Sequence, residues 1–144
     1  MRILAVDPGS KNIGVAISDP TGTIANPLTI IKHVSRSKDA AKISHLATEH
    51  GAELIIVGQP IDVDGVPNFE GRQAARLAAE IRAQTTLQIA LWDESFSTRE
   101  AHSARRELGS PREKRKGHLD DLAATVILQS YLDAQRPDKM YEET

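Results

Sequence analysis

The order of apolar segments along the chain constrains its fold more than any other feature. Three short apolar runs follow one another near the N-terminus, at residues 2–6, 13–18 and 24–33, and only turn-forming stretches separate them. Strands joined by such short turns pair antiparallel. The chain then alternates helical and strand-like segments, and a helical crossover makes neighbouring strands parallel. The sequence therefore predicts a mixed sheet.

The later segments complete this prediction. The expected elements after the first three strands are a helix ending near Gly51, a strand within 52–60, a helix over 69–84 capped by Asn68, a strand within 87–95, a helix beginning at Ser97 and a last helix over 119–135. The result is an α/β fold with a five-stranded sheet, a three-strand antiparallel meander plus two parallel strands, and helices on both faces. Pro27 favours an edge or bulge position in the third strand. We expect one domain over 1–137 and a frayed tail over 138–144.

Composition narrows the classes of protein that the chain can belong to. It has no cysteine, which excludes thiol chemistry, disulfides and cysteine-based zinc sites. The net charge of −2 is not that of a strongly basic nucleic-acid coat protein, and five aromatic residues (one Trp, two Tyr and two Phe) are few for a module that stacks bases on several rings. No window approaches the roughly 18 apolar residues of a membrane span. We therefore expect a cytoplasmic protein without a membrane partner.

Carboxylates stand where apolar runs meet loops. Asp7 follows the first strand, Asp93 and Glu94 follow the last strand, and Asp120 and Asp121 open the last helix. Ligands of open α/β sheets collect outside the carboxyl ends of strands. If the first and last strands are parallel neighbours, these acids meet at one rim of the sheet.

Such a cluster requires a counter-charge. Converging carboxylates repel one another unless a cation neutralises them, and oxygen ligands without cysteine select Mg²⁺ or Mn²⁺. Two such ions, about 3.5–4 Å apart, are the usual apparatus of phosphodiester hydrolysis. Each acid also has an ordinary interpretation, Asp7 or Asp93 as a turn residue and Asp120 or Asp121 as a helix N-cap. Helical spacing does not choose between Asp120 and Asp121.

Four ordered blocks resemble a known family. They are "DPGSKNIGVAISDP", "IIVGQPIDVDG", "WDESFSTREA" and "HLDDLAATVILQSYLD". Together they resemble the YqgF family, also called RuvX, over nearly the whole chain and at the usual spacings. Its members are single-domain proteins with an RNase H-like fold, related to the RuvC Holliday junction resolvase.

The resemblance implies a two-metal nuclease that carries two Mg²⁺ or Mn²⁺ ions. The family pattern places its acids at Asp7, at Glu94 with Asp93 as second choice, and at Asp120, which is the first acid of the "DxxAA" pattern. Members are usually described as nucleases that mature the 5′ end of precursor 16S rRNA, so RNA in a pre-ribosomal particle is the expected partner of a monomer. Resolution of branched DNA is the alternative, and the two-fold symmetry of a junction would then require a homodimer.

The residues expected to bind the nucleic acid depart from the family pattern. Members generally carry arginine where this chain has Asn12 and Ser95, and arginine holds two phosphate oxygens at once. Lys11 is either a substitute phosphate ligand or a solvated turn residue. The basic stretch before Asp120 is expected to contact the nucleic-acid backbone through Arg112, Lys114, Arg115 and Lys116. The two missing arginines also permit a third reading, a non-catalytic RNA-binding assembly factor. Asp62 and Asp64 are better interpreted as turn residues than as ligands.

Overall fold

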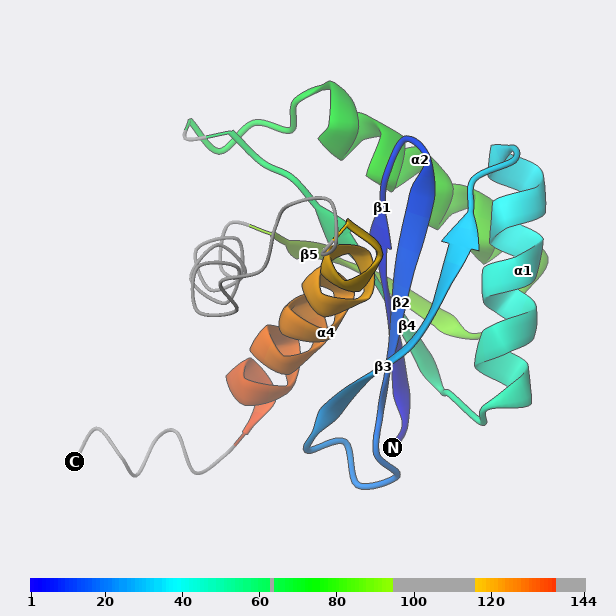
Figure 1. The fold of residues 1–144 in the computed structure, drawn as a ribbon, viewed down its shortest axis with the longest axis vertical. Coiled ribbons are helices and arrows are strands. Elements are labelled where there is room, and N and C mark those ends of the chain that lie inside the picture. Colours follow the sequence, from blue (N-terminus) through cyan, green and yellow to red (C-terminus); the bar gives the residue numbers. More distant parts are fainter. Residues whose placement is uncertain (63, 95–115, 137–144) are drawn as a thin grey trace.

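A computed structural model describes residues 1–62, 64–94 and 116–136, with side chains from residue 122 onward in the last range. The described residues form five strands and three helices (Figure 1). In chain order these are β1 (Ile3–Pro8), β2 (Asn12–Ser18), β3 (Ala25–Lys32), α1 (Arg36–Glu49), β4 (Leu54–Gln59), α2 (Phe69–Gln84), β5 (Gln88–Asp93) and α4 (Lys116–Gln135). The helix expected at Ser97 lies outside the described residues.

The sheet has the order β3-β2-β1-β4-β5. The pairs β1–β2 and β2–β3 are antiparallel, whereas β1–β4 and β4–β5 are parallel, which confirms the predicted mixed sheet. The first and last strands are not direct neighbours, however, because β4 lies between them. Pro27 lies on the edge strand β3, and the β2–β3 register shifts beside it, between Val15 and Ala16, as its lack of a backbone N–H favours.

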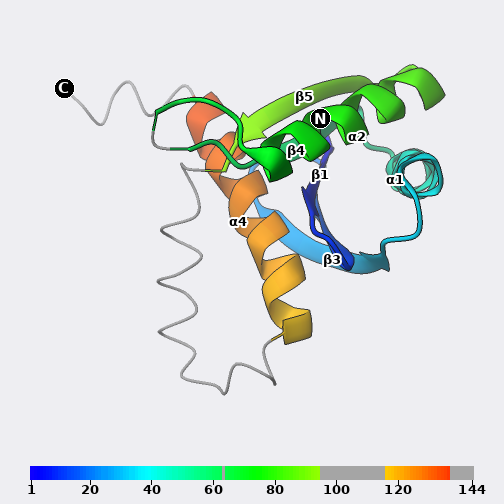
Figure 2. The same cartoon turned by 90° about the horizontal axis from the view of Figure 1, so that it is seen from above.

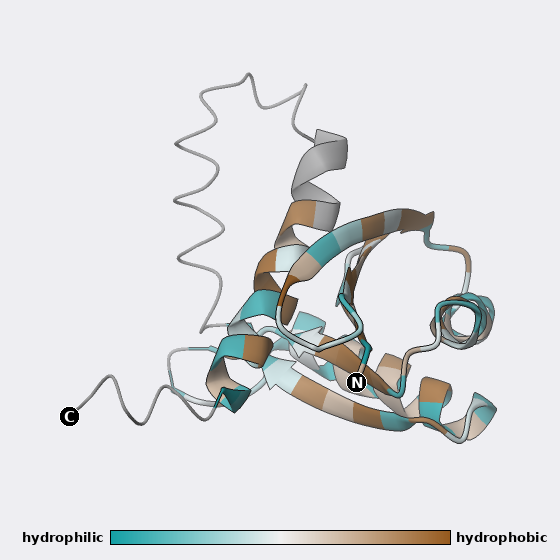
Figure 3. Ribbon diagram, turned by 90° about the horizontal axis from the view of Figure 1, so that it is seen from below, coloured by the Kyte–Doolittle hydropathy of each residue, from teal (hydrophilic) through white to brown (hydrophobic). Residues whose placement is uncertain are grey.

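Each face of the sheet packs against its own helices (Figure 2). Leu4 and Val6 belong to the hydrophobic core formed with α1 and α2, whereas Ile3 and Ala5 belong to the core formed with α4. This alternation is the period-2 pattern of a strand buried on both sides. Figure 3 shows the consequence, because hydrophobic colour dominates the strands and alternates with hydrophilic colour along α2. Each fully buried Leu or Ile contributes about 1.5–3 kcal/mol.

Helix ends follow local capping rules where these are visible. Asn68 caps α2 as predicted, since its Oδ1 accepts from the backbone N–H of Gly71 at 2.8 Å. Ser35 caps α1 in the same way through Lys38. The last helix begins at Lys116, three residues before the expected start. The three added residues, Lys116, Gly117 and His118, carry no apolar periodicity, so the sequence pattern gives no signal for this start.

This earlier start removes one interpretation of the last helix. Asp120 and Asp121 stand inside α4 and not at its first residue, so neither is its N-cap. Within the part of the chain that the structure describes, no helix is long and apolar enough to cross a membrane.

Candidate active site

Strand alternation directs two of the predicted acids to the same side of the sheet. Asp7 follows Ala5 by two residues, and Glu94 follows Trp92 by two. Ala5 and Trp92 both pack in the core under α4. Asp93, which stands between Trp92 and Glu94, comes two residues after Leu91, and Leu91 packs in the core under α1 and α2. The fold therefore pairs Asp7 with Glu94 and turns Asp93 toward the other face.

A glycine on β4 makes room for this pairing. Gly58 is opposite Trp92 and follows Val57, the partner of Val6, so it lies between the ends of β1 and β5. A Cβ atom at Gly58 would stand 2.8 Å from Glu94 Oε1 and 2.8 Å from Ile127 Cδ1. Glu94 thus occupies the space above Gly58 and reaches across β4 toward Asp7. The single signal in the sequence was a glycine inside an apolar run, which often marks close approach by another group.

The pairing shifts the protonation of Glu94. Burial raises its pKa to about 9, and a hydrogen bond with Asp7 and the negative charges of Asp7, Glu70 and Asp93 add to the rise. Near neutral pH the two carboxyl groups consequently share a proton. Glu70, in the first turn of α2, contributes to this field although nothing in the sequence distinguished it, because acids are common at helix starts.

The donor chemistry of the pair fits a hard divalent cation. Two carboxyl groups held together supply oxygen ligands, and a cation in place of the shared proton would cancel their repulsion. In residues 1–62, 64–94 and 122–136 no group of three His, Asp or Glu side chains forms a complete metal cluster. The third predicted ligand, Asp120, and its neighbour Asp121 have side chains outside the described part, so the choice between them stays a prediction.

Helix α4 reaches the acid pair through Ile127, whose Cδ1 lies over Gly58. Asp120 precedes Ile127 by two turns, about 10 Å along the helix axis at 1.5 Å per residue. In Figure 1 the first turns of α4 are directed toward the end of the sheet where β1 turns into β2. Asp120 and Asp121 belong to these first turns of α4, and their convergence with Asp7 and Glu94 stays a prediction.

The residues predicted to bind nucleic acid are described only in part. Lys11 is exposed in the turn between β1 and β2, and Asn12 begins β2, half-buried and paired with Lys32. Both follow Asp7 within five residues. Lys116 is the first residue of α4, with its side chain outside the described part. The other predicted contacts lie outside the described residues: Ser95, Arg112, Lys114 and Arg115.

The acids of the loop after β4 have a local role. The backbone carbonyl of Asp62 accepts from the N–H of Gly65 at 2.9 Å, and Asp64 Oδ1 accepts from the N–H of Val66 at 3.2 Å. Asn68, the cap of α2, donates from Nδ2 to Asp62 Oδ1 at 3.3 Å. These contacts agree with the interpretation of both acids as turn residues.

Comparison with solved structures places the fold. The RuvC protein of Thermus thermophilus in complex with a Holliday junction substrate aligns with a TM-score of 0.61 and 13% identity, over 94% of this chain and 95% of that one. The Fowlpox virus Holliday junction resolvase aligns with a TM-score of 0.55 and 18% identity, over 93% and 99% of the two chains. At these identities the likeness shows a shared architecture, the RNase H-like fold of RuvC.

Sequence comparison identifies the family. A protein of Thermoanaerobacter pseudethanolicus named "Putative pre-16S rRNA nuclease" is 42% identical over 137 residues, which cover 94% of this chain and 99% of that protein. A protein of Clostridium beijerinckii with the same name is 40% identical over 133 residues, 92% and 96% of the two chains. Residues 1–134 match the family described as "RuvX: Holliday junction resolvase". The chain therefore belongs to the RuvX family.

Proposed function

We propose that this chain is a metal-dependent endonuclease that hydrolyses phosphodiester bonds in RNA, with the 5′ end of precursor 16S rRNA as its substrate in the cytoplasm. Family membership and the names of the relatives support a nuclease function. The names of the relatives also favour the ribosomal substrate. The observation that carries the metal-dependent chemistry is the pairing of Asp7 with Glu94 on the α4 side of the sheet.

In this proposal Asp7, Glu94 and Asp120 hold Mg²⁺ or Mn²⁺, with Asp93 and Asp121 as the alternative ligands. Two ions at such a site activate the attacking water and stabilise the leaving oxygen. Asp7 and Glu94 share a proton near neutral pH, and a bound cation would take its place between the two carboxylates. Gly58 keeps Glu94 in reach of Asp7. These side chains would hold the cation at the carboxyl ends of β1 and β5.

In this proposal, residues around these acids bind the phosphate groups of the substrate. Lys11 is exposed beside Asp7 and supplies a positive charge for a phosphate. Asn12 and Ser95 supply uncharged hydrogen bonds at the two positions where the resemblance implies arginine. The basic stretch before Asp120 adds Arg112, Lys114, Arg115 and Lys116.

Branched DNA is the second candidate substrate. The family description names a Holliday junction resolvase, and the fold matches that of RuvC bound to a junction. A four-way junction has two-fold symmetry, so this activity requires a symmetric homodimer, whereas cleavage of an RNA leader is compatible with a monomer. A sedimentation measurement that finds a monomer at the concentration of the cleavage assay counts against the junction.

One experiment separates the candidates. The purified protein is offered a precursor 16S rRNA leader, an unrelated linear RNA and a four-way DNA junction, each with Mg²⁺ or Mn²⁺. Asp7→Asn serves as the disabled variant and Asp64→Asn as the matched control in the loop after β4. We expect cleavage of the leader by the native protein and the control. Cleavage of the junction alone overturns the RNA substrate, and binding without cleavage by every variant overturns the nuclease in favour of an assembly factor.

A further inference from the structure

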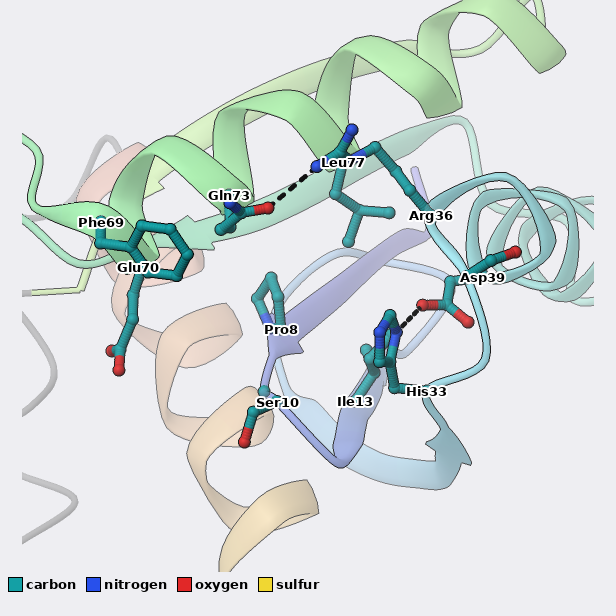
Figure 4. Close-up of a pocket in the computed structure, with 12 residues that line it drawn as sticks. Pro8, Ser10, Ile13, His33, Arg36, Asp39, Phe69, Glu70, Gln73 and Leu77 are labelled. Atoms are coloured by element: carbon teal, nitrogen blue, oxygen red, sulfur yellow. Dashed lines mark hydrogen bonds and ion pairs between the residues drawn. The ribbon is translucent and has the colours of Figure 1, made fainter.

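A cavity of about 580 Å³ opens on the side of the sheet that α1 and α2 cover (Figure 4). Pro8 and Ile13 of the β1–β2 hairpin and Leu77 of α2 line it. Ile13 and Leu77 belong to the core under α1 and α2, whereas Asp7 faces α4. The cavity therefore opens on the other side of the sheet from the acid pair and adjoins it through Glu70, which lines the cavity and adds to the pKa rise of Glu94. Its volume is within the range of sites for small organic ligands, about 300–1,000 Å³.

One end of the cavity carries the guanidinium of Arg36. Arg36, the first residue of α1, is the lining residue with a permanent positive charge, and its Nη2 donates to Gln73 Oε1 at 2.9 Å. The nearby carboxylate of Asp39 is 2% exposed and is already engaged. It contacts the ring of His33 through Oδ2 and accepts from the backbone N–H of Val34 through Oδ1 at 3.0 Å. The guanidinium of Arg36 consequently has donors to offer an anion that enters the cavity.

The other end is aromatic and acidic. Phe69, the first residue of α2, is 64% exposed, and Figure 4 shows its ring beside Glu70 at the end of the cavity opposite Arg36 and Asp39. A large exposed ring at the mouth of a cavity offers a face on which a planar base can stack. The carboxylate of Glu70 repels a phosphate at this end. Charge thus orients a ligand with its anionic group at Arg36 and its planar group at Phe69.

We propose that this cavity binds a nucleotide, with the phosphate at Arg36 and the base against Phe69. Pro8, Ile13 and Leu77 form the apolar surface between these two groups. The same chemistry has two sources, a free 5′-mononucleotide or a nucleotide within the strand that the acid pair cleaves. The second source rests on the proposed function, whereas binding of a free nucleotide does not.

Titration with adenosine 5′-monophosphate, followed by amide chemical shifts, tests the site directly. We expect saturable shifts in the hairpin turn and the starts of α1 and α2. Arg36→Ala should weaken binding by at least about tenfold, the loss of one charge-assisted hydrogen bond. Arg36→Lys should recover part of that loss. Phe69→Ala should weaken the binding of adenosine monophosphate more than the binding of inorganic phosphate. Arg76→Ala, an exposed arginine of α2 outside the cavity, is the matched control and should bind normally.

A second titration distinguishes the sources. The Asp7→Asn protein is saturated with adenosine monophosphate, and a single-stranded RNA of eight nucleotides is added. Displacement of the nucleotide by RNA assigns the cavity to the substrate strand, and joint binding assigns it to a free nucleotide. No saturable binding at millimolar nucleotide, or equal binding by native, Arg36→Ala and Phe69→Ala proteins with unchanged melting temperatures, overturns the site. Failure of nucleotide binding in a protein that still cleaves RNA rejects this inference and leaves the proposed nuclease intact.

Discussion

The two faces of the sheet handle charge differently at the same end of β1. On the α4 face, Asp7 and Glu94 are close enough to share a proton, and burial raises the pKa of Glu94 to about 9. On the α1/α2 face, protein donors, namely the His33 ring and a backbone N–H, satisfy the buried carboxylate of Asp39. Near neutral pH the first arrangement holds a proton that a cation could replace, whereas in the second every carboxylate oxygen already has a protein partner. Burial of a carboxylate alone therefore does not indicate a metal site. The groups that contact the carboxylate determine whether its charge still needs a cation.

The largest expected effect comes from Asp7→Asn. The substitution removes one charge of the pair, so cleavage should fall by at least about 10²-fold, because even outer partners of metal ligands are typically worth 10–100-fold. Gel analysis of a labelled precursor rRNA leader in Mg²⁺ measures this fall in cleavage.

Asp93→Asn tests the alternative ligand on the other face of the sheet. Asp93 is adjacent to Glu94 in sequence but faces α2, so its substitution should reduce cleavage far less than Asp7→Asn does. Equal losses in the two variants would show that the two faces do not divide the acids as strand alternation indicates. A normal circular dichroism spectrum of both variants excludes loss of the fold as the cause.

Gly58→Ala should come next in size. The new Cβ would lie 2.8 Å from both Glu94 Oε1 and Ile127 Cδ1, so the side chains above β4 must shift. Overpacking of this kind costs about 1–3 kcal/mol of unfolding free energy. Because Glu94 is displaced, cleavage should also fall when it is measured well below the melting temperature.

Gly51→Ala separates stability from activity. Gly51 has a φ of 71° and open space around it, so alanine there strains the backbone without touching either face of the sheet. We expect a lower melting temperature with unchanged cleavage at low temperature. If Gly58→Ala behaves in the same way, then Glu94 does not depend on the space above Gly58.

The sequence predicted the sheet, the strand directions and the cap at Asn68 because each depends on local rules, namely turn residues, helical crossovers and side-chain oxygen at a helix start. It left Asp93 and Glu94 open because neighbouring residues in a strand differ only in the face they occupy. That face is set by register against β4, which no local pattern encodes. Gly58 and Glu70 were missed for the same reason, since their importance arises from contacts across strands and elements.

The raised pKa of Glu94 predicts a pH dependence in the absence of metal. An ordinary glutamate loses its proton near pH 4.5, whereas Glu94 in the folded protein keeps it to about pH 9. The folded state therefore binds more protons than the unfolded state in this window, so the contribution of Glu94 to stability is fully present below pH 4.5 and is lost as pH rises toward 9. In EDTA, the melting temperature of native protein should fall between pH 6 and pH 9 by at least about 3 °C more than that of Glu94→Gln. Mg²⁺ should diminish this difference, and parallel curves in EDTA would contradict the shared proton.

The smallest expected effect lies at the opposite end of the sheet, where Asp19 closes the β2–β3 loop. Its carboxylate accepts from the backbone N–H groups of Thr23 and Ile24 at 2.8 and 2.9 Å, and these bonds, with the hydroxyl of Thr21, hold its pKa well below the ordinary 3.8. The sign is opposite to that of Glu94, because stabilisation by Asp19 is present above pH 3.8 and is lost as pH falls. Asp19→Ala should lower the melting temperature at pH 7 by less than Gly58→Ala does, and the difference from native protein should shrink toward pH 3. Cleavage should be unchanged, since the loop is remote from the acid pair. If Mg²⁺ changes the melting temperature of Asp19→Ala by a different amount from that of native protein, then the two ends of the sheet are coupled.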